Sequence, residues 1–402
     1  MKFRVLTEEE FRSFLNQHPL RTFLQTPEIA HLRELTGWKK HYVGVEVNEL
    51  IVAGTMMVSR KNRLGVSEFY APRGFLIDYH DKALLSFFVS NVKDYIKKQK
   101  GYVLKIDPYL VLQERDTNGD VVQDGIDNRS VVETLTSMGF LKTGFEEQAK
   151  WMYVLDLKGK TEEQVLKNMK PNTRNNIRKT MKSGILLEEL QYDQLDQFYQ
   201  IMMETGKRKH FEIRSLAYFQ RMYQIFHPRN EIKYLVAKLN LVEYIKNIQL
   251  EIDENQKKKQ AMSDAIYNEN AKQAIEKDCE NLKKRIEFAE AIQKEKGSEI
   301  VLSGSMFVMT KPEIIYLSSG NYEEYMRFYG QYRIQWEMIQ YAVKNGFQRY
   351  NFYGIMGNFN PDDPDYGIYN FKKGFNGFVE ELIGEYELPI SRWYRFLKLI
   401  RK

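Results

Sequence analysis

A run of aromatic and basic residues at 369–377 follows a Gly-, Asp- and Pro-rich loop at 354–367. Long loops without a periodic pattern that end in such a cluster often hold a functional site. Phe371 and Lys372 lie in the middle of this run. A lysine ammonium in such a place would offset negative charge on a reacting oxygen, so Lys372 is the strongest catalytic candidate. The alternative for Lys372 or Lys373 is a solvated surface charge.

Several other kinds of chemistry are disfavoured by the residues present. The chain has six His and one Cys, without a His-x-x-x-His or Cys-x-x-Cys pair, so neither a structural zinc site nor a Cys-His nucleophile is indicated. It contains no P-loop, no Gly-x-Gly-x-x-Gly fingerprint and no Gly-x-Ser-x-Gly elbow. We expect no metal and no cofactor. The remaining Lys, Arg, Tyr and Asp suit transfer to an amine by positioning and electrostatics.

A second candidate site is a basic segment at 158–185. It carries eight Lys and Arg against two Glu, within a chain whose net charge is only +6. Asn172 precedes a run that tolerates helix, and on a helix Arg174, Arg178 and Lys182 would form one stripe because they recur every four residues. Such a stripe suits phosphates, and its alternative is a solvated helix face.

Length and composition set the frame for these candidates. A chain of 402 residues with 43% hydrophobic and 28% charged residues is globular and long enough for two or three domains. Cys279 is the only cysteine, and the first ten residues contain no apolar segment of signal-peptide length, so we expect a cytosolic protein. The longest near-apolar stretch, 51–58, is too short to span a bilayer, and any work at a membrane would be done from its surface.

The pattern along the chain predicts mixed α/β architecture in two similar halves. Short strand-like runs alternate with helical ones over residues 1 to about 155, and a similar order restarts at 151–157. Heptad spacing between 239 and 297 interrupts the second half and predicts an antiparallel pair of helices with a break near 263–270. Ten basic and eleven acidic residues at 251–296 argue against this arm as a strong phosphate-binding surface.

Four stretches together carry a family resemblance. They stand in order along the chain, with the predicted helical arm between the second and the third. The sequence thereby resembles the Fem family of peptidoglycan-bridge aminoacyltransferases, over essentially its whole length. The stretches are Leu104-Lys105-Ile106-Asp107-Pro108-Tyr109, Asn172-Thr173-Arg174-Asn175-Asn176-Ile177-Arg178-Lys179, Asn351-Phe352-Tyr353-Gly354-Ile355-Met356-Gly357 and Phe371-Lys372-Lys373-Gly374-Phe375.

The resemblance implies two tandem GNAT-like domains, at 1–155 and at 156–238 with 298–402, and a coiled-coil arm at 239–297 inserted in the second. It implies transfer of an amino acid from aminoacyl-tRNA to the stem-peptide amine of a lipid-linked peptidoglycan precursor. The chain lacks the Arg/Gln-x-x-Gly-x-Gly/Ala loop that binds coenzyme A, which fits a family that uses tRNA as donor. The alternatives are a coenzyme A-dependent N-acyltransferase and a non-catalytic tRNA-binding scaffold.

Family roles are assigned to individual residues through these motifs. The resemblance implies a catalytic aromatic-Lys pair, a precursor-binding Tyr and Asp, and a phosphate-gripping Arg followed by a Tyr, while the basic stripe would contact tRNA. Asp107, a tRNA oxygen or a substrate oxygen would take the proton of the acceptor amine. Where the family has a Lys in the first helix this chain has an Arg, and Glu212 replaces a Thr near the phosphate-gripping Arg. The assigned residues are Phe371, Lys372, Tyr102, Asp107, Arg214, Tyr218 and Arg33, with Arg174, Arg178 and Lys182 in the stripe.

The C-terminal segment 392–402 has a pattern of its own. Trp393, Phe396, Leu397 and Ile400 recur at helical spacing, and five of the other residues are basic. Such a helix would hold the protein peripherally at the inner face of the membrane, where a lipid-linked substrate lies. The alternative is that this face packs on the globular body.

Overall fold

The computed structural model describes residues 1–263 and 268–400, and it separates into two compact units. The first unit consists of residues 1–156 and 351–402, and the second of residues 157–350. The sequence-based division placed 298–402 in the second domain, whereas here 351–402 groups with the N-terminal residues. The reason is that strand β15 (Tyr386–Pro389) pairs antiparallel with strand β5 (Gly101–Ile106) of the N-terminal sheet. Which strands belong to which GNAT-like domain stays a prediction.

The first unit contains a seven-stranded sheet in the order β1-β2-β3-β4-β5-β15-β7. Its neighbouring strands run antiparallel, except that β4 and β5 are parallel. Strand β14 pairs antiparallel with β6 and with β8. The strands not yet given are β1 (Lys2–Val5), β2 (Lys39–Val47), β3 (Leu50–Lys61), β4 (Ser67–Ala71), β6 (Val111–Glu114), β7 (Leu141–Lys142), β8 (Trp151–Asp156), β13 (Arg349–Gly354, which the division between the units cuts) and β14 (Phe378–Leu382).

Three helices of the first unit, α1 to α3, begin at side-chain caps. The Thr7 hydroxyl accepts a hydrogen bond from the Glu10 amide at 3.2 Å, and the Glu10 carboxylate accepts one from the Thr7 amide at 2.8 Å, which is a capping box. Thr26 and Pro27 begin the next helix, and Asp81 caps the third. The helices are α1 (Glu8–Gln17), α2 (Pro27–Glu34), α3 (Lys82–Lys98), α4 (Arg129–Ser137), α12 (Tyr366–Lys373) and α13 (Tyr394–Ile400).

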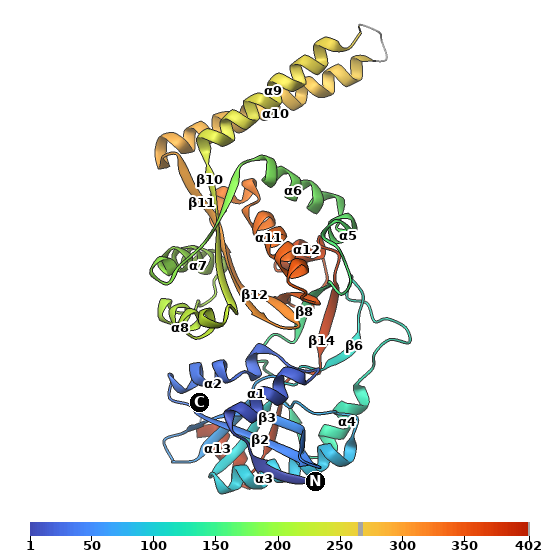
Figure 1. The fold of residues 1–402 in the computed structure, drawn as a ribbon, viewed down its shortest axis with the longest axis vertical. Helices are drawn as coiled ribbons and strands as arrows, with labels where there is room; N and C mark the ends of the chain where they lie inside the picture. The colour runs from blue at the N-terminus through green and yellow to red at the C-terminus, as the bar shows by residue number, and fades with distance from the viewer. Residues whose placement is uncertain (264–267, 401–402) are drawn as a thin grey trace. The chain divides into compact units, whose positions relative to one another are not determined.

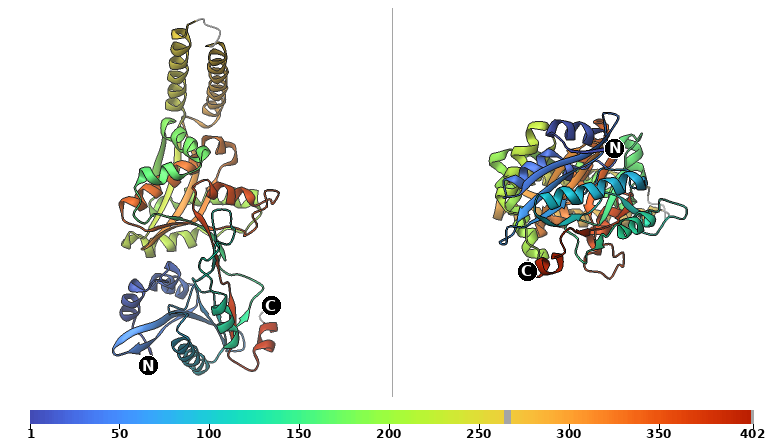
Figure 2. Two further views of the ribbon diagram at one scale, coloured as in Figure 1. Left: turned by 90° about the vertical axis from the view of Figure 1, so that its right-hand side faces the viewer. Right: turned by 90° about the horizontal axis from the view of Figure 1, so that it is seen from below.

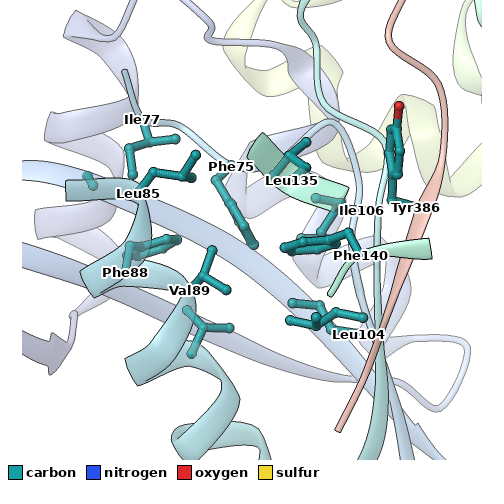
Figure 3. Packing of buried hydrophobic residues seen from close by; sticks show 14 of the residues in the cluster. Phe75, Ile77, Leu85, Phe88, Val89, Leu104, Ile106, Leu135, Phe140 and Tyr386 are labelled. Atoms are coloured by element: carbon teal, nitrogen blue, oxygen red, sulfur yellow. The ribbon is translucent and has the colours of Figure 1, made fainter. Parts of the chain in front are cut away.

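The main core of the first unit lies between this sheet and helices α3 and α4 (Figure 3). Phe88 on α3 is fully buried, and its ring meets that of Phe75 edge-on with centroids 5.0 Å apart. Leu104 and Ile106 of β5 point into the same cluster. This packing fixes the C-terminal end of β5, where the candidate Asp107 follows directly.

The second unit is built around the antiparallel strands β9 (Ile185–Glu189), β10 (Ile232–Asn240), β11 (Glu299–Thr310) and β12 (Glu313–Asn321), which lie in the order β12-β11-β10-β9 (Figure 1). Besides the arm its helices are α5 (Glu162–Asn168), α6 (Pro171–Lys182), α7 (Leu195–Lys209), α8 (Leu216–Phe226) and α11 (Gly330–Lys344). The basic helix predicted after Asn172 is α6. It begins at Pro171 with Lys170 at the cap position, since proline is well suited to a first helical position.

Two long helices, α9 (Leu241–Ala261) and α10 (Glu269–Lys296), form the arm between β10 and β11 and lie side by side (Figures 1 and 2). The heptad pattern placed Ile245 at the interface, but Tyr244 is the buried residue there and Ile245 is half-buried. Tyr244 faces inward because its ring packs edge-on against Phe328, 5.2 Å away. Of the predicted break at 263–270, residues 264–267 lie outside the described part.

Among the described helices, none combines the length and the apolar character that a bilayer crossing requires.

We expect Phe88→Ala to lower the free energy of unfolding by about 3–5 kcal/mol, because it removes a fully buried ring and leaves a cavity beside Phe75. The matched control is Phe145→Ala, since Phe145 is 70% exposed in the same unit and should cost less than about 0.5 kcal/mol. Urea denaturation followed by circular dichroism measures both. Equal midpoints for the two variants would contradict this assignment of the core.

Candidate active site

Lys372 lies near the C-terminal end of α12 and is buried, with only 6% of its surface exposed. Its Nζ donates hydrogen bonds to the carbonyl oxygens of Tyr353 at 3.2 Å and Gly354 at 2.5 Å. Both acceptors stand at the end of β13. Within residues 1–263 and 268–400, Lys372 forms no ion pair, so its charge is held by carbonyl dipoles alone.

Burial lowers the pKa of the Lys372 ammonium to about 7, because removal from water disfavours the charged form and no carboxylate compensates. An ammonium has three N–H groups, of which the two carbonyls take two. The third N–H makes no hydrogen bond among the described residues. Lysines held in this way are typical of sites where charge develops during a reaction.

Phe371, the neighbour predicted to act with Lys372, is half-buried. Its ring meets Phe375 edge-on with centroids 5.5 Å apart, and Phe375 in turn packs on Phe352 of β13 at 4.8 Å. These rings fix α12 against β13, so Phe371 contributes to the position of Lys372.

Asp107 follows β5 and is 2% exposed. Its Oδ1 accepts a hydrogen bond from the Arg73 backbone N–H at 2.9 Å, and its Oδ2 lies 3.4 Å from Nη1 of Arg73. Arg73 is equally buried, and its Nη2 donates to the carbonyl oxygen of Ala149 at 2.7 Å. Oδ2 makes no hydrogen bond among the described residues.

The pKa of Asp107 is raised to about 6, since burial disfavours the carboxylate by more than the charge and the backbone N–H of Arg73 favour it. A carboxylate with this pKa is ionised at neutral pH and is a stronger base than an exposed aspartate. Of its two oxygens, Oδ2 is the buried one that makes no hydrogen bond among the described residues.

Side-chain contacts connect the two predicted catalytic residues within the first unit. Tyr353, whose carbonyl oxygen accepts from Lys372, has its own N–H bonded to Oδ1 of Asn351 at 2.7 Å. Nδ2 of Asn351 donates to the phenol oxygen of Tyr109 at 3.2 Å. The guanidinium of Arg73 lies 5.7 Å from the centre of the Tyr109 ring, and Arg73 holds Asp107. The sequence predicted both end residues, and the structure brings them into one network.

Four members of this network, Tyr353, Asn351, Tyr109 and Arg73, were not singled out from the sequence. Tyr353 and Asn351 stand in the third family motif, and Tyr109 ends the first. In the structure the backbone of Tyr353 has a φ of 60°, which residues other than glycine rarely adopt. Arg73 stands in a Pro-Arg-Gly turn after β4 and also has a positive φ, of 55°. Strain of this kind often persists at functional sites.

Tyr102, predicted to bind the precursor with Asp107, lies at the opposite end of β5. Five residues of strand separate them by roughly 16 Å. Tyr102 is buried beneath Tyr394 and Leu397 of α13 and lines an apolar groove of about 580 Å³. A ligand that touches both Tyr102 and Asp107 must therefore be long, and the shared role stays a prediction.

The C-terminal helix α13 presents two faces. Tyr394 and Leu397 are buried, whereas Trp393 is 60% and Phe396 is 57% exposed. The sequence grouped Trp393, Phe396 and Leu397 on one face, and the structure splits that group because Leu397 packs with Tyr394. The side chain of Ile400, the fourth member, lies outside the described part.

The candidate phosphate-binding arginines each face an aromatic ring. The guanidinium of Arg33, on α2 of the first unit, lies 5.9 Å from the Trp38 ring centre. That of exposed Arg214, just before α8 of the second unit, lies 5.5 Å from the ring of its predicted partner Tyr218. Among the described residues, neither arginine forms an ion pair, so no described carboxylate neutralises either charge.

The predicted basic stripe lies on α6 but its members differ. Arg174 is half-buried, and its Nη1 donates to the carbonyl oxygens of Lys167 at 2.5 Å and Met169 at 2.8 Å, which ties α6 to the end of α5. Arg178 and Lys182 are exposed. The structure therefore gives Arg174 a structural role and leaves two cations of the stripe at the surface.

Comparison with known proteins identifies the family of this chain. Residues 6–402 match the FemAB family. The chain is 31% identical over 406 residues to aminoacyltransferase FemA of Staphylococcus aureus, covering 98% of this chain and 96% of the relative. The crystal structure of FemX superposes with a TM-score of 0.77 at 25% identity over the full length of both chains. A tandem GNAT protein from the clavulanic acid biosynthesis pathway superposes over 97% of this chain and 98% of its own with a TM-score of 0.50 at 9% identity, which shows the fold alone.

The fold is therefore α/β with two tandem GNAT-like domains, and the helical arm is inserted in the second. The chain belongs to the FemAB family and is an aminoacyltransferase. The resemblance to the Fem family that the motifs indicated is confirmed.

We expect Lys372→Met to lower turnover by about 10²-fold or more with little change in KM for the acceptor, because one donor aimed at an oxyanion is typically worth this much. Lys373→Met is the matched control, since Lys373 is the neighbouring lysine and its Nζ lies over the Tyr369 ring instead.

The pH dependence adds a second readout. The pKa of Lys372 is lowered to about 7, so the cation is present below pH 7 and is lost as the pH rises through 7. The ratio of wild-type to Lys372→Met activity should therefore fall between pH 6 and 8. A constant ratio, or turnover near wild type, would remove the Lys372 cation from the chemistry.

Proposed function

We propose that this chain transfers an amino acid from aminoacyl-tRNA to the stem-peptide amine of a lipid-linked peptidoglycan precursor, in the synthesis of the interpeptide bridge. The observation that carries the proposal is the buried Lys372 without a carboxylate partner, at the position where the family places its aromatic-Lys pair. Whole-chain membership of the FemAB family supports the same reaction.

The reaction is an attack of an amine on an ester, so the donor is already activated. The amine adds to the ester carbonyl to give a tetrahedral oxyanion, and the ribose oxygen then leaves as the new amide forms. The third N–H of Lys372 donates to the oxyanion or to the leaving oxygen. A preorganised donor of this kind typically lowers the barrier by about 3 kcal/mol.

The acceptor amine must lose a proton, because a lysine-like amine has a pKa of about 10.4 in water. Asp107 supports this step through Oδ2, whose carboxylate is kept ionised at neutral pH although burial raises its pKa to about 6. Arg73 positions Asp107 by holding Oδ1 through its backbone N–H.

Four residues are proposed to bind the precursor: Arg33, Tyr102, Arg214 and Tyr218. Each arginine is stacked on an aromatic ring, which orients the guanidinium without neutralising it. One oriented guanidinium group can bind two phosphate oxygens at once, and a diphosphate-linked precursor supplies such oxygens. Exposed Arg178 and Lys182 are proposed to contact tRNA phosphates.

The test is to incubate the purified chain with charged tRNAs and the lipid-linked precursor and to weigh the product. We expect the precursor to gain the mass of one amino-acid residue, only when the tRNA is charged, and Lys373→Met to give the same product. No gain with any charged tRNA, together with acylation by an acyl-coenzyme A, would contradict the proposed donor and favour the coenzyme A-dependent alternative.

We further propose that the enzyme works in the cytoplasm, at the inner face of the membrane, through the exposed side of α13. Trp393 and Phe396 are exposed there beside Arg392 and Arg395, while the buried side of α13 packs on the first unit. Leu64 adds a further exposed apolar side chain at the rim of the neighbouring groove. Aromatic rings next to cations favour the surface of an anionic bilayer.

We expect Trp393→Ser combined with Phe396→Ser to weaken sedimentation with anionic phospholipid vesicles by about tenfold, with unchanged activity on a precursor that lacks the lipid. Both side chains are largely exposed, so the fold should persist. Phe145→Ser, which alters another exposed ring, is the control. Vesicle binding equal to wild type in the double variant would contradict a membrane role for α13.

A further inference from the structure

A polar cavity lies at the root of the arm, entirely within the second unit. Its volume is about 180 Å³. Helices α9 and α10 supply one side, and the C-terminal end of α6 together with the short 3-10 helix at Glu323–Phe328 supplies the other. The lining residues are Lys179, Ser183, Tyr244, Arg285, Phe288, Arg327, Phe328 and Tyr329.

The lining contains three cations and no carboxylate. Within residues 1–263 and 268–400, Lys179, Arg285 and Arg327 form no ion pair. Other lysines of the arm do pair: Lys259 lies 3.1 Å from Glu276, and Lys246 lies 3.7 Å from Glu243. The root therefore concentrates positive charge, whereas the arm beyond it is balanced.

Aromatic rings hold the two arginines of the cavity in fixed orientations. Arg327 stacks on Phe288 with its guanidinium carbon 4.1 Å from the ring centre. Nε of Arg285 donates to the phenol oxygen of Tyr244 at 3.1 Å, and its guanidinium lies 5.6 Å from the same ring. Rings orient a guanidinium without cancelling its charge, so the cavity is prepared for an anion from outside the chain.

The position of Lys179 indicates what kind of anion this is. Lys179 stands on α6 next to Arg178, and exposed Lys182 follows about one helical turn further on. An extended polyanion can contact the cavity and these surface cations together, because it carries several phosphates along one chain. Phosphodiester backbones with bases that stack on aromatic rings have this chemistry.

We propose that the arm-root cavity binds a phosphodiester group of the donor tRNA through Arg285, Arg327 and Lys179. The inference rests on the proposed tRNA-dependent function and adds a binding site to it. The arm then acts as a support that brings Arg285 to the body, and its balanced outer part is not required to contact RNA.

The test measures the affinity of the full chain for uncharged tRNA as a function of salt. Arg285→Gln combined with Arg327→Gln should weaken binding about tenfold and lower the slope of log affinity against log salt by about two phosphate contacts. Lys283→Gln combined with Lys284→Gln removes the same charge from exposed positions on the same helix and should leave the slope unchanged.

Two further measurements separate binding from folding. Lys179→Gln alters an exposed side chain at the end of α6 and should lower the slope by about one contact, even if the double variant does not fold. Turnover with a short donor, an amino-acid ester of a dinucleotide, should be unchanged in all these variants, because this donor lacks the extended phosphodiester chain that the cavity is proposed to bind. Lost turnover with the short donor would assign these residues to the fold and overturn the proposal.

The outcomes distinguish this inference from the function on which it rests. If the wild type binds no tRNA, the proposed donor is wrong and the cavity proposal falls with it. If the wild type binds tRNA and the cavity variants bind it equally well, only the cavity proposal is overturned. A raised KM for the lipid-linked precursor with unchanged tRNA affinity would assign the cavity to the precursor instead.

Discussion

The buried ammonium of Lys372, bonded to two backbone carbonyls, is the interaction on which the account of this protein depends. Moving a cation from water into a protein costs desolvation free energy, and here no carboxylate offsets that cost by pairing with the ammonium. The chain supplies fixed carbonyl dipoles instead, which requires α12 and the end of β13 to meet closely. The rings of Phe371, Phe375 and Phe352 provide that contact. A structural lysine would gain more from an acidic partner or from exposure, so this arrangement favours a functional role.

The second constraint is the Arg73–Asp107 pair. Here opposite charges are buried together, and the backbone N–H of Arg73 donates a hydrogen bond to Oδ1 of Asp107. Tyr353, whose backbone is strained, contacts Lys372 directly. It is connected to the Arg73–Asp107 pair through Asn351 and Tyr109. One network thus keeps a cation without a counter-charge and a carboxylate of raised pKa in a defined arrangement, which would accelerate the proposed attack of an amine on an ester.

The sequence predicted those features whose causes are local. The position of Asn172 and the spacing of the basic residues located the start of α6 to within a residue or two, and the motifs made Lys372 and Asp107 candidates. Features that depend on contacts between distant segments were missed or misplaced. Arg73 is 34 residues from Asp107 along the chain, and only the fold brings them together. Leu397 and Trp393 share a helical spacing, but packing against Tyr102 buries only Leu397.

The most direct test of the central claim is a titration of Lys372 itself, by nuclear magnetic resonance of protein with ¹³Cε-labelled lysine. The resonance is assigned by its absence in Lys372→Met. The account predicts a midpoint of about 7, well below that of the exposed lysines, because the ammonium is buried and unpaired. A midpoint near 10.5, the ordinary value for lysine, would show that Lys372 is solvated or paired and would contradict the account.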